Sequence, residues 1–167
     1  MSDPSTVCAV VAGGASSAII DLYTRRVPNE LTLGIAALGV ALAAMHMTGV
    51  SVPGALGGLA LGLVLMLPGH VIGATGAGDV KLFAALGTLL GPTRTGVAFL
   101  YTALAGGLLV VIVAVRRRRL GATVGRTARL VRTGGANVAD IERATENNRF
   151  AYAPAIAAGA LAAALGL

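Results

Sequence analysis

Two aspartates stand out in a chain with few charged residues. Between Asp3 and Asp140 the sequence contains three acidic residues, and two of them, Asp21 and Asp79, lie where an apolar segment ends or begins. The third, Glu30, falls in a short polar turn. A carboxylate at the centre of a membrane span costs about 2.5–3.5 kcal/mol, and less near its ends, so acids in apolar segments indicate a functional site. Asp21 and Asp79 are therefore the candidate catalytic residues.

Two carboxylates held close together can activate water. Like charges a few ångströms apart resist simultaneous ionisation, so the pair holds one proton between them. The ionised carboxylate takes a proton from water, which attacks a carbonyl carbon, while the protonated partner donates to the carbonyl oxygen and later helps the amine leave. This is the chemistry of an aspartic protease, and it requires neither a metal ion nor a cofactor.

Each aspartate also has a purely structural interpretation. Asp21 precedes Arg25 by four residues, which is the spacing of an ion pair on one helical face. Asp79 follows Gly78 and opens a helical pattern, so it would serve as a helix N-cap. Taken together, two acids expected at the same membrane edge favour the catalytic interpretation.

The residues around Asp79 suggest further roles. Gly76 and Gly78 would let an extended substrate backbone come close to Asp79, because glycine has no side chain. Lys81 is the only lysine, and its charge would favour an ionised aspartate or contact substrate. The alternative is a lysine that extends its charge to the membrane surface.

The composition places these residues in a membrane protein. Hydrophobic residues make up 56% of the chain and charged residues 12%, whereas about 25% charged residues is typical of globular domains. Cys8 is the only cysteine, which excludes an intramolecular disulfide and a zinc cluster. His46 and His70 are isolated and are expected to have packing or interfacial roles, so no metal site is predicted.

The apolar segments predict an all-α polytopic fold with about six transmembrane helices in a single domain over residues 1–167. Each span needs about 20 apolar residues. The expected spans are Ser5–Leu22, Leu31–Gly49, Pro53–Gly73, Asp79–Gly91, Thr95–Val115 and Phe150–Leu167.

The fourth segment is short, and charge decides its assignment. Only if Asp79–Gly91 crosses the membrane do Arg25-Arg26 and the run from Arg116 to Arg119 share the cytoplasmic side. Both termini are then outside, and Asp21 and Asp79 share the cytoplasmic edge. The N-terminal apolar run lacks the preceding positive charge of a signal peptide, so it is expected to be an uncleaved span.

Small residues recur at helical spacing. Gly54, Gly58 and Gly62 follow one another at intervals of four, as do Gly69 with Gly73 and Gly87 with Gly91. This spacing is typical of close helix packing in membranes, although a high glycine content would produce it by chance.

Nine of the thirteen basic residues lie between Arg116 and Arg149. This basic loop, over about residues 116–149, is expected to be partly helical and to lie on anionic lipid headgroups, at about 1 kcal/mol per basic residue. A solvated determinant of topology is the alternative. Because the charge lies beside apolar spans, nucleic acid is not an expected partner.

Three stretches resemble a known family, the type IV prepilin peptidases. IIDLYTRRVPN (Ile19–Asn29) resembles their first catalytic segment, with Val27-Pro28-Asn29 where Ile-Pro-Asn is usual. GAGDVKLFAALGTLLGP (Gly76–Pro92) resembles the second, whose signature is GxGD followed by Lys-Leu. FAYAPAIAAGAL (Phe150–Leu161) resembles the final span, with Ala151 in place of a proline.

The resemblance implies a GxGD-type aspartic endopeptidase of the bacterial inner membrane. Asp21 and Asp79 would be its catalytic pair, and prepilin-like precursors of type IV or Flp-type pili its substrates, cut on the cytoplasmic side. Substrate-binding or structural support would come from the motif residues Pro28, Asn29, Gly76, Gly78 and Lys81. The small size resembles the short form of Tad/Flp systems, without the paired CxxC motifs of relatives that also methylate their product.

Other functions stay open from the sequence. A non-enzymatic membrane carrier or pilus-assembly scaffold would also place acids in apolar segments, although carriers more often place them near the midplane between repeated halves. A different GxGD protease, of the preflagellin or presenilin-like kind, is a third alternative. The VPN segment and the final span favour the prepilin type.

Overall fold

The computed structural model describes residues 3–24, 27–71, 75–116 and 152–167. In these residues the fold is all-α, as predicted, and contains no strand. The helices are α1 (Pro4–Thr24), α2 (Asn29–Ala44), α3 (Val52–Val71), α4 (Ala77–Arg116) and α7 (Ala153–Leu165). Apart from Arg116, the predicted basic loop lies outside the described residues, as does Arg25, the proposed ion-pair partner of Asp21.

The predicted fourth and fifth spans form the two arms of one bent helix. Gly91 has φ 70° and ψ 171°, which is not helical, and the helix resumes at once with Pro92. Proline is favoured at a first helical position because its φ is preset and its missing N–H is not needed there. No separate connection over residues 92–94 is therefore formed. We call residues 77–90 the first arm and residues 92–116 the second arm.

The first arm is the centre of the bundle. From Leu82 to Gly91 every residue is buried, and its side chains form much of the hydrophobic core with residues of α7. α4 contacts all the other helices, most extensively α3 and α7. Residues 82–91 are therefore covered by protein rather than exposed on the surface of the bundle.

Glycines allow α3 to lie directly on the first arm. A Cβ atom added to Gly58 would collide with the carbonyl oxygen of Gly87, and one added to Gly62 would lie 2.8 Å from Cα of Ala84. The predicted close packing is thus confirmed for these positions, whereas Gly54 contacts only its own turn through Ser51 and Val50.

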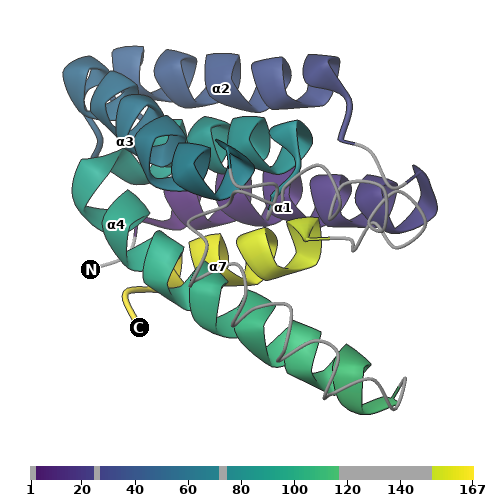
Figure 1. Ribbon diagram of the computed structural model, residues 1–167. Coiled ribbons are helices and arrows are strands. Elements are labelled where there is room, and N and C mark those ends of the chain that lie inside the picture. The colour runs from purple at the N-terminus through teal and green to yellow at the C-terminus, as the bar shows by residue number, and fades with distance from the viewer. Residues whose placement is uncertain (1–2, 25–26, 72–74, 117–151) are drawn as a thin grey trace.

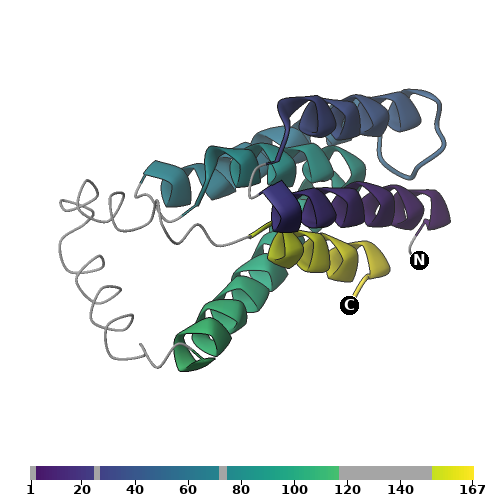
Figure 2. The same ribbon diagram turned by 90° about the vertical axis from the view of Figure 1, so that its right-hand side faces the viewer.

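The elements alternate in direction, so the bundle has two distinct ends (Figures 1 and 2). The first holds both chain termini, the connection between α2 and α3, and the bend at Gly91; we call it the bend end. The other holds the end of α1 and the starts of α2, α4 and α7, and we call it the aspartate end. Asp21 and Asp79 lie at this same end, the first in the last turn of α1 and the second in the first turn of α4.

Two of the described helices, α1 and α3, are long and apolar enough to cross a membrane. α2 and α7 are apolar but shorter. α2 ends at Ala44 and not at the predicted Gly49. His46 in the following turn has φ 55°, a left-handed conformation that an α-helix cannot continue through. Large apolar side chains are exposed along several helices, among them Leu22, Leu33, Val64, Leu100, Leu104 and Leu108.

Candidate active site

Asp21 lies on the buried face of α1. It continues a row of buried residues that recur at helical spacing, Thr6, Val10, Gly14 and Ser17, and its side chain is only 5% exposed. Its Oδ2 accepts a hydrogen bond of 3.3 Å from the backbone N–H of Ala153, the first residue of α7. The N–H groups of a helix's first turn have no partner within the helix, and Tyr152 provides no side-chain cap. Asp21 therefore satisfies a donor that α7 leaves open.

The structural interpretation expected Asp79 to be the N-cap of α4. Asp79 lies instead inside the first turn of that helix. Gly76 precedes the helix, and its carbonyl oxygen accepts the N–H groups of Asp79 and Val80 at 3.1 and 3.2 Å. The side chain turns back, so that Asp79 Oδ2 accepts the N–H of Gly76 at 3.1 Å. An acid at the third helical position commonly bonds back in this way, and the positive end of the helix dipole favours its charge.

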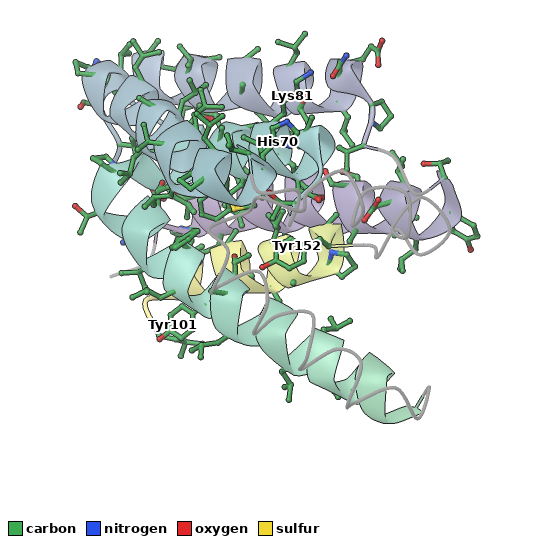
Figure 3. The ribbon with its side chains drawn as sticks, in the orientation of Figure 1. His70, Lys81, Tyr101 and Tyr152 are labelled. Atoms are coloured by element: carbon green, nitrogen blue, oxygen red, sulfur yellow. The ribbon has the colours of Figure 1, made fainter. Side chains whose placement is uncertain are left out.

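The start of α7 contacts Asp21 and lies within range of the charge of Asp79. Asp21 is bonded to Ala153, and the charge of Asp79 acts on the side chain of the preceding residue, Tyr152. Figure 3 shows Tyr152 at the start of α7, where that helix meets the bundle. Both carboxylates therefore lie at the end of the bundle where α7 begins.

The predicted support residues also come together at the aspartate end. Lys81 Nζ donates a hydrogen bond of 3.0 Å to Asn29 Oδ1, which ties the first arm to the start of α2 (Figure 3). Neither predicted role of Lys81 anticipated this contact, because the two residues are far apart in the sequence. Pro28 occupies the cap position before α2 with an extended backbone, and its carbonyl oxygen accepts the N–H of Thr32.

The two glycines of the GAGD stretch have different surroundings. A Cβ atom on Gly76 would lie 3.1 Å from Asp79 Oδ2, so a side chain there would press on the carboxylate. A Cβ atom on Gly78 would meet Val27 at 3.6 Å, an ordinary contact. Gly76 is therefore the position where the absence of a side chain matters for Asp79.

Among the described residues, no three His, Cys, Asp or Glu side chains are grouped to hold a metal ion. His70 lies at the end of α3, and its Nδ1 is 3.1 Å from the carbonyl oxygen of Thr75, so it spans the connection to α4. Cys8 is exposed.

One residue of the site had no assigned role in the sequence. Tyr152 belongs to the FAYAPAIAAGAL stretch, yet nothing there indicates that its ring reaches α4. The only local sign is a polar ring in an apolar segment, directly before the start of a helix.

No curated protein and no solved structure matches the chain. The sequence does match the type IV leader peptidase family, over residues 8–111. This match covers well over half of the chain and includes both Asp21 and Asp79. With its all-α membrane fold and its two aspartates at one end of the bundle, the chain belongs to the type IV leader peptidase family.

Proposed function

We propose that this chain is an aspartic endopeptidase that removes the leader from type IV or Flp-type prepilins, with Asp21 and Asp79 as its catalytic pair. The observation that carries the proposal is the position of both aspartates at the end of the bundle where α7 begins, with Asp21 buried against Ala153. Neither a helix cap nor a surface ion pair requires a buried carboxylate of α1 and a carboxylate of α4 at the same end of the bundle. Membership of a leader peptidase family supports the same class of reaction.

The proposed reaction uses one proton shared between the carboxylates. The ionised aspartate takes a proton from water, and the water oxygen forms a bond to the scissile carbonyl carbon. The protonated aspartate gives its proton to the carbonyl oxygen. When the intermediate collapses, the C–N bond breaks and the amine leaves with a proton from the pair. The N–H groups of Ala153 and Gly76 each hold one Oδ2 atom, which orients the carboxylates for this exchange.

The proposed setting is the bacterial inner membrane, with one peptidase domain over residues 1–167 that crosses six times. Support comes from the alternating helices and from the exposed apolar side chains of α1 to α4, which lipid would cover. The aspartate end would face the cytoplasm and both termini the outside. The precursor would present a polar leader followed by an apolar helix, so that its scissile bond lies at the membrane edge. The basic loop would lie on anionic headgroups.

The test is to co-express the chain with a pilin precursor and to follow the size of the precursor on a gel. We expect wild-type protein to shorten the precursor, and Asp21→Asn or Asp79→Asn to leave it uncut while still inserting into the membrane. The matched control is Glu30→Gln, which removes an exposed acid from the first turn of α2 at the same end and should leave cleavage intact. Processing by either aspartate variant would refute the catalytic assignment.

Topology is tested separately with reporter fusions. A reporter placed after Arg119 should report the cytoplasm, and one placed after Gly49 the outside. A periplasmic signal after Arg119 would refute the proposed six spans.

A further inference from the structure

The ring of Tyr152 fits against bare backbone on the second arm of α4. A Cβ atom added to Gly106 would lie 2.7 Å from Cζ of Tyr152 and would also collide with its ring atom Cε2 and its hydroxyl oxygen. The hydroxyl group donates a hydrogen bond of 3.4 Å to the carbonyl oxygen of Thr102, one turn earlier. The ring therefore fills a space that only glycine leaves, and its hydroxyl is attached to the same arm.

The backbone of Tyr152 leads directly into the contact with Asp21. Tyr152 is the residue before α7, with φ −93° and ψ −17°, and the next N–H along the chain is that of Ala153, which bonds Asp21 Oδ2. Because a peptide group is planar and rigid, a displacement of Tyr152 also displaces the Ala153 N–H. The attachment of the ring to the second arm is thus separated from the donor to Asp21 by a single residue.

The hydroxyl group of Tyr152 is held on Thr102, and the charge of Asp79 also reaches it. One side chain thereby connects the second arm to the start of α7.

We propose that Tyr152 is a positioning residue for Asp21, which holds the Ala153 N–H against that carboxylate by fastening the start of α7 to the second arm at Thr102 and Gly106. This inference rests on the proposed peptidase function. It predicts that Tyr152 acts on the rate of the chemical step rather than on the binding of the precursor, because the contacts that carry the proposal are with Thr102 and Gly106 of the second arm.

The first experiment compares two tyrosines of the same protein. Tyr152→Phe keeps the ring on Gly106 but removes the hydroxyl, and we expect kcat for precursor cleavage to fall about two- to tenfold, as for the loss of one hydrogen bond, with KM unchanged. Tyr101→Phe is the matched control, because Tyr101 lies next to Thr102 on the second arm but points away from Tyr152 (Figure 3). Rates are expressed per folded enzyme, measured by thermal unfolding in detergent.

The second experiment compares two neighbouring glycines. Gly106→Ala pushes the ring away from the arm, so we expect kcat to fall about ten- to hundredfold, since a small misplacement of catalytic groups has effects of this size. Gly107→Ala adds the same methyl group where no atom lies within 4 Å, and it should cleave like wild type. The double variant Tyr152→Phe with Gly106→Ala should be no slower than Gly106→Ala alone, because both changes break one contact.

These results separate the inference from the function on which it rests. If Asp21→Asn cleaves as fast as wild type, the proposed function is wrong. If Asp21→Asn is inactive and Tyr152→Phe cleaves like Tyr101→Phe, the positioning role is wrong and the function stands. A Tyr152→Phe variant that changes only the unfolding temperature, with kcat per folded enzyme unaltered, would likewise refute the positioning role.

Discussion

The two ends of the bundle each place an aspartate against a backbone N–H, but in different surroundings. At the bend end, Asp3 precedes α1 and uses both oxygens, since Oδ1 accepts the N–H of Ser5 at 3.3 Å and Oδ2 the N–H of Gly49 at 2.9 Å. At the aspartate end, Asp21 is 5% exposed, and within the described residues Ala153 is its one hydrogen-bond donor. Burying a carboxylate is costly unless it is fully bonded. Asp3 thus has a sufficient structural explanation, and Asp21 does not.

The two ends also differ in what shapes them. Backbone conformation shapes the bend end, where Gly91 turns α4 back on itself and leaves a cavity of about 350 Å³ lined by residues such as Asp3, Ser51 and Arg94. At the aspartate end the shape comes from side chains that join distant segments, Asp21 to Ala153 and Lys81 to Asn29. Changes at the first end should therefore alter stability, and changes to the two aspartates of the second should alter catalysis.

The largest expected effect contrasts the two aspartates directly. Asp21→Ala should reduce the rate of precursor cleavage by about 10³-fold or more, as the loss of a catalytic group does. Asp3→Ala should leave the rate per folded enzyme unchanged and lower the free energy of unfolding by about 1 kcal/mol, the value of a helix cap. Initial cleavage rates and thermal unfolding measure the two effects. Equal losses of activity in both variants would remove the distinction between the ends.

The next effect concerns the crossing of α3 and the first arm, which lies between the two ends. Gly58→Ala should lower the free energy of unfolding by about 3 kcal/mol, because its methyl group would meet the backbone of Gly87, which cannot yield. Gly57→Ala is the neighbouring control, since its nearest contact is Pro92 Cγ at 3.8 Å. Thermal unfolding in detergent compares Gly58→Ala with Gly57→Ala. Similar stabilities of the two variants would mean that α3 and the first arm do not touch at Gly58.

At the bend end, Gly91→Ala should lower the free energy of unfolding by about 2 kcal/mol. The φ of 70° with ψ of 171° is a conformation that residues other than glycine adopt only under strain. Gly96 lies in the second arm, and an added Cβ atom there would meet no atom within 4 Å. Gly96→Ala should therefore raise the free energy of unfolding by up to about 1 kcal/mol, because alanine has the higher helix propensity. Chemical denaturation measures the free energy of unfolding of both variants. Changes of opposite sign would support the bend, and an unchanged free energy of unfolding for Gly91→Ala would contradict it.

The smallest effect concerns the contact between the first arm and α2. Lys81→Met should lower the free energy of unfolding by less than about 1 kcal/mol, because the hydrogen bond to Asn29 is exposed. A double-mutant cycle with Asn29→Ala should show a coupling of about 0.5 kcal/mol. Arg94→Met at the bend end serves as the control. A cycle without coupling would leave Lys81 free for another role.

Much of the arrangement could be predicted from sequence because membrane insertion is governed by local composition. Apolar length and the positions of arginines placed Asp21 and Asp79 at one end before any contact was known, and the structure has them at one end. The structural alternative for Asp79, a helix N-cap, was wrong, because α4 begins two residues earlier, at Ala77. Local patterns do not determine which glycine N–H group the side chain reaches.

The contacts that assemble the site were beyond sequence reasoning. Tyr152 meets Gly106 and Thr102 only because the second arm returns after Gly91 at one particular angle, and no local pattern encodes that angle. Lys81 and Asn29 pair for a related reason, since the crossing of α2 and the first arm sets their separation. Small residues allow these approaches, but their spacing alone cannot say which helices approach.

The sequence by itself determined the kind of protein: apolar helices, two isolated carboxylates at their ends, and the motifs of a leader peptidase family. These follow from transfer free energies and side-chain chemistry, which each segment carries wherever it lies. The tertiary structure alone decided that the first N–H of α7 bonds Asp21 and that the hydroxyl of Tyr152 bonds Thr102 of the second arm. Such contacts depend on the packing of whole helices, because they join groups that lie far apart in the sequence.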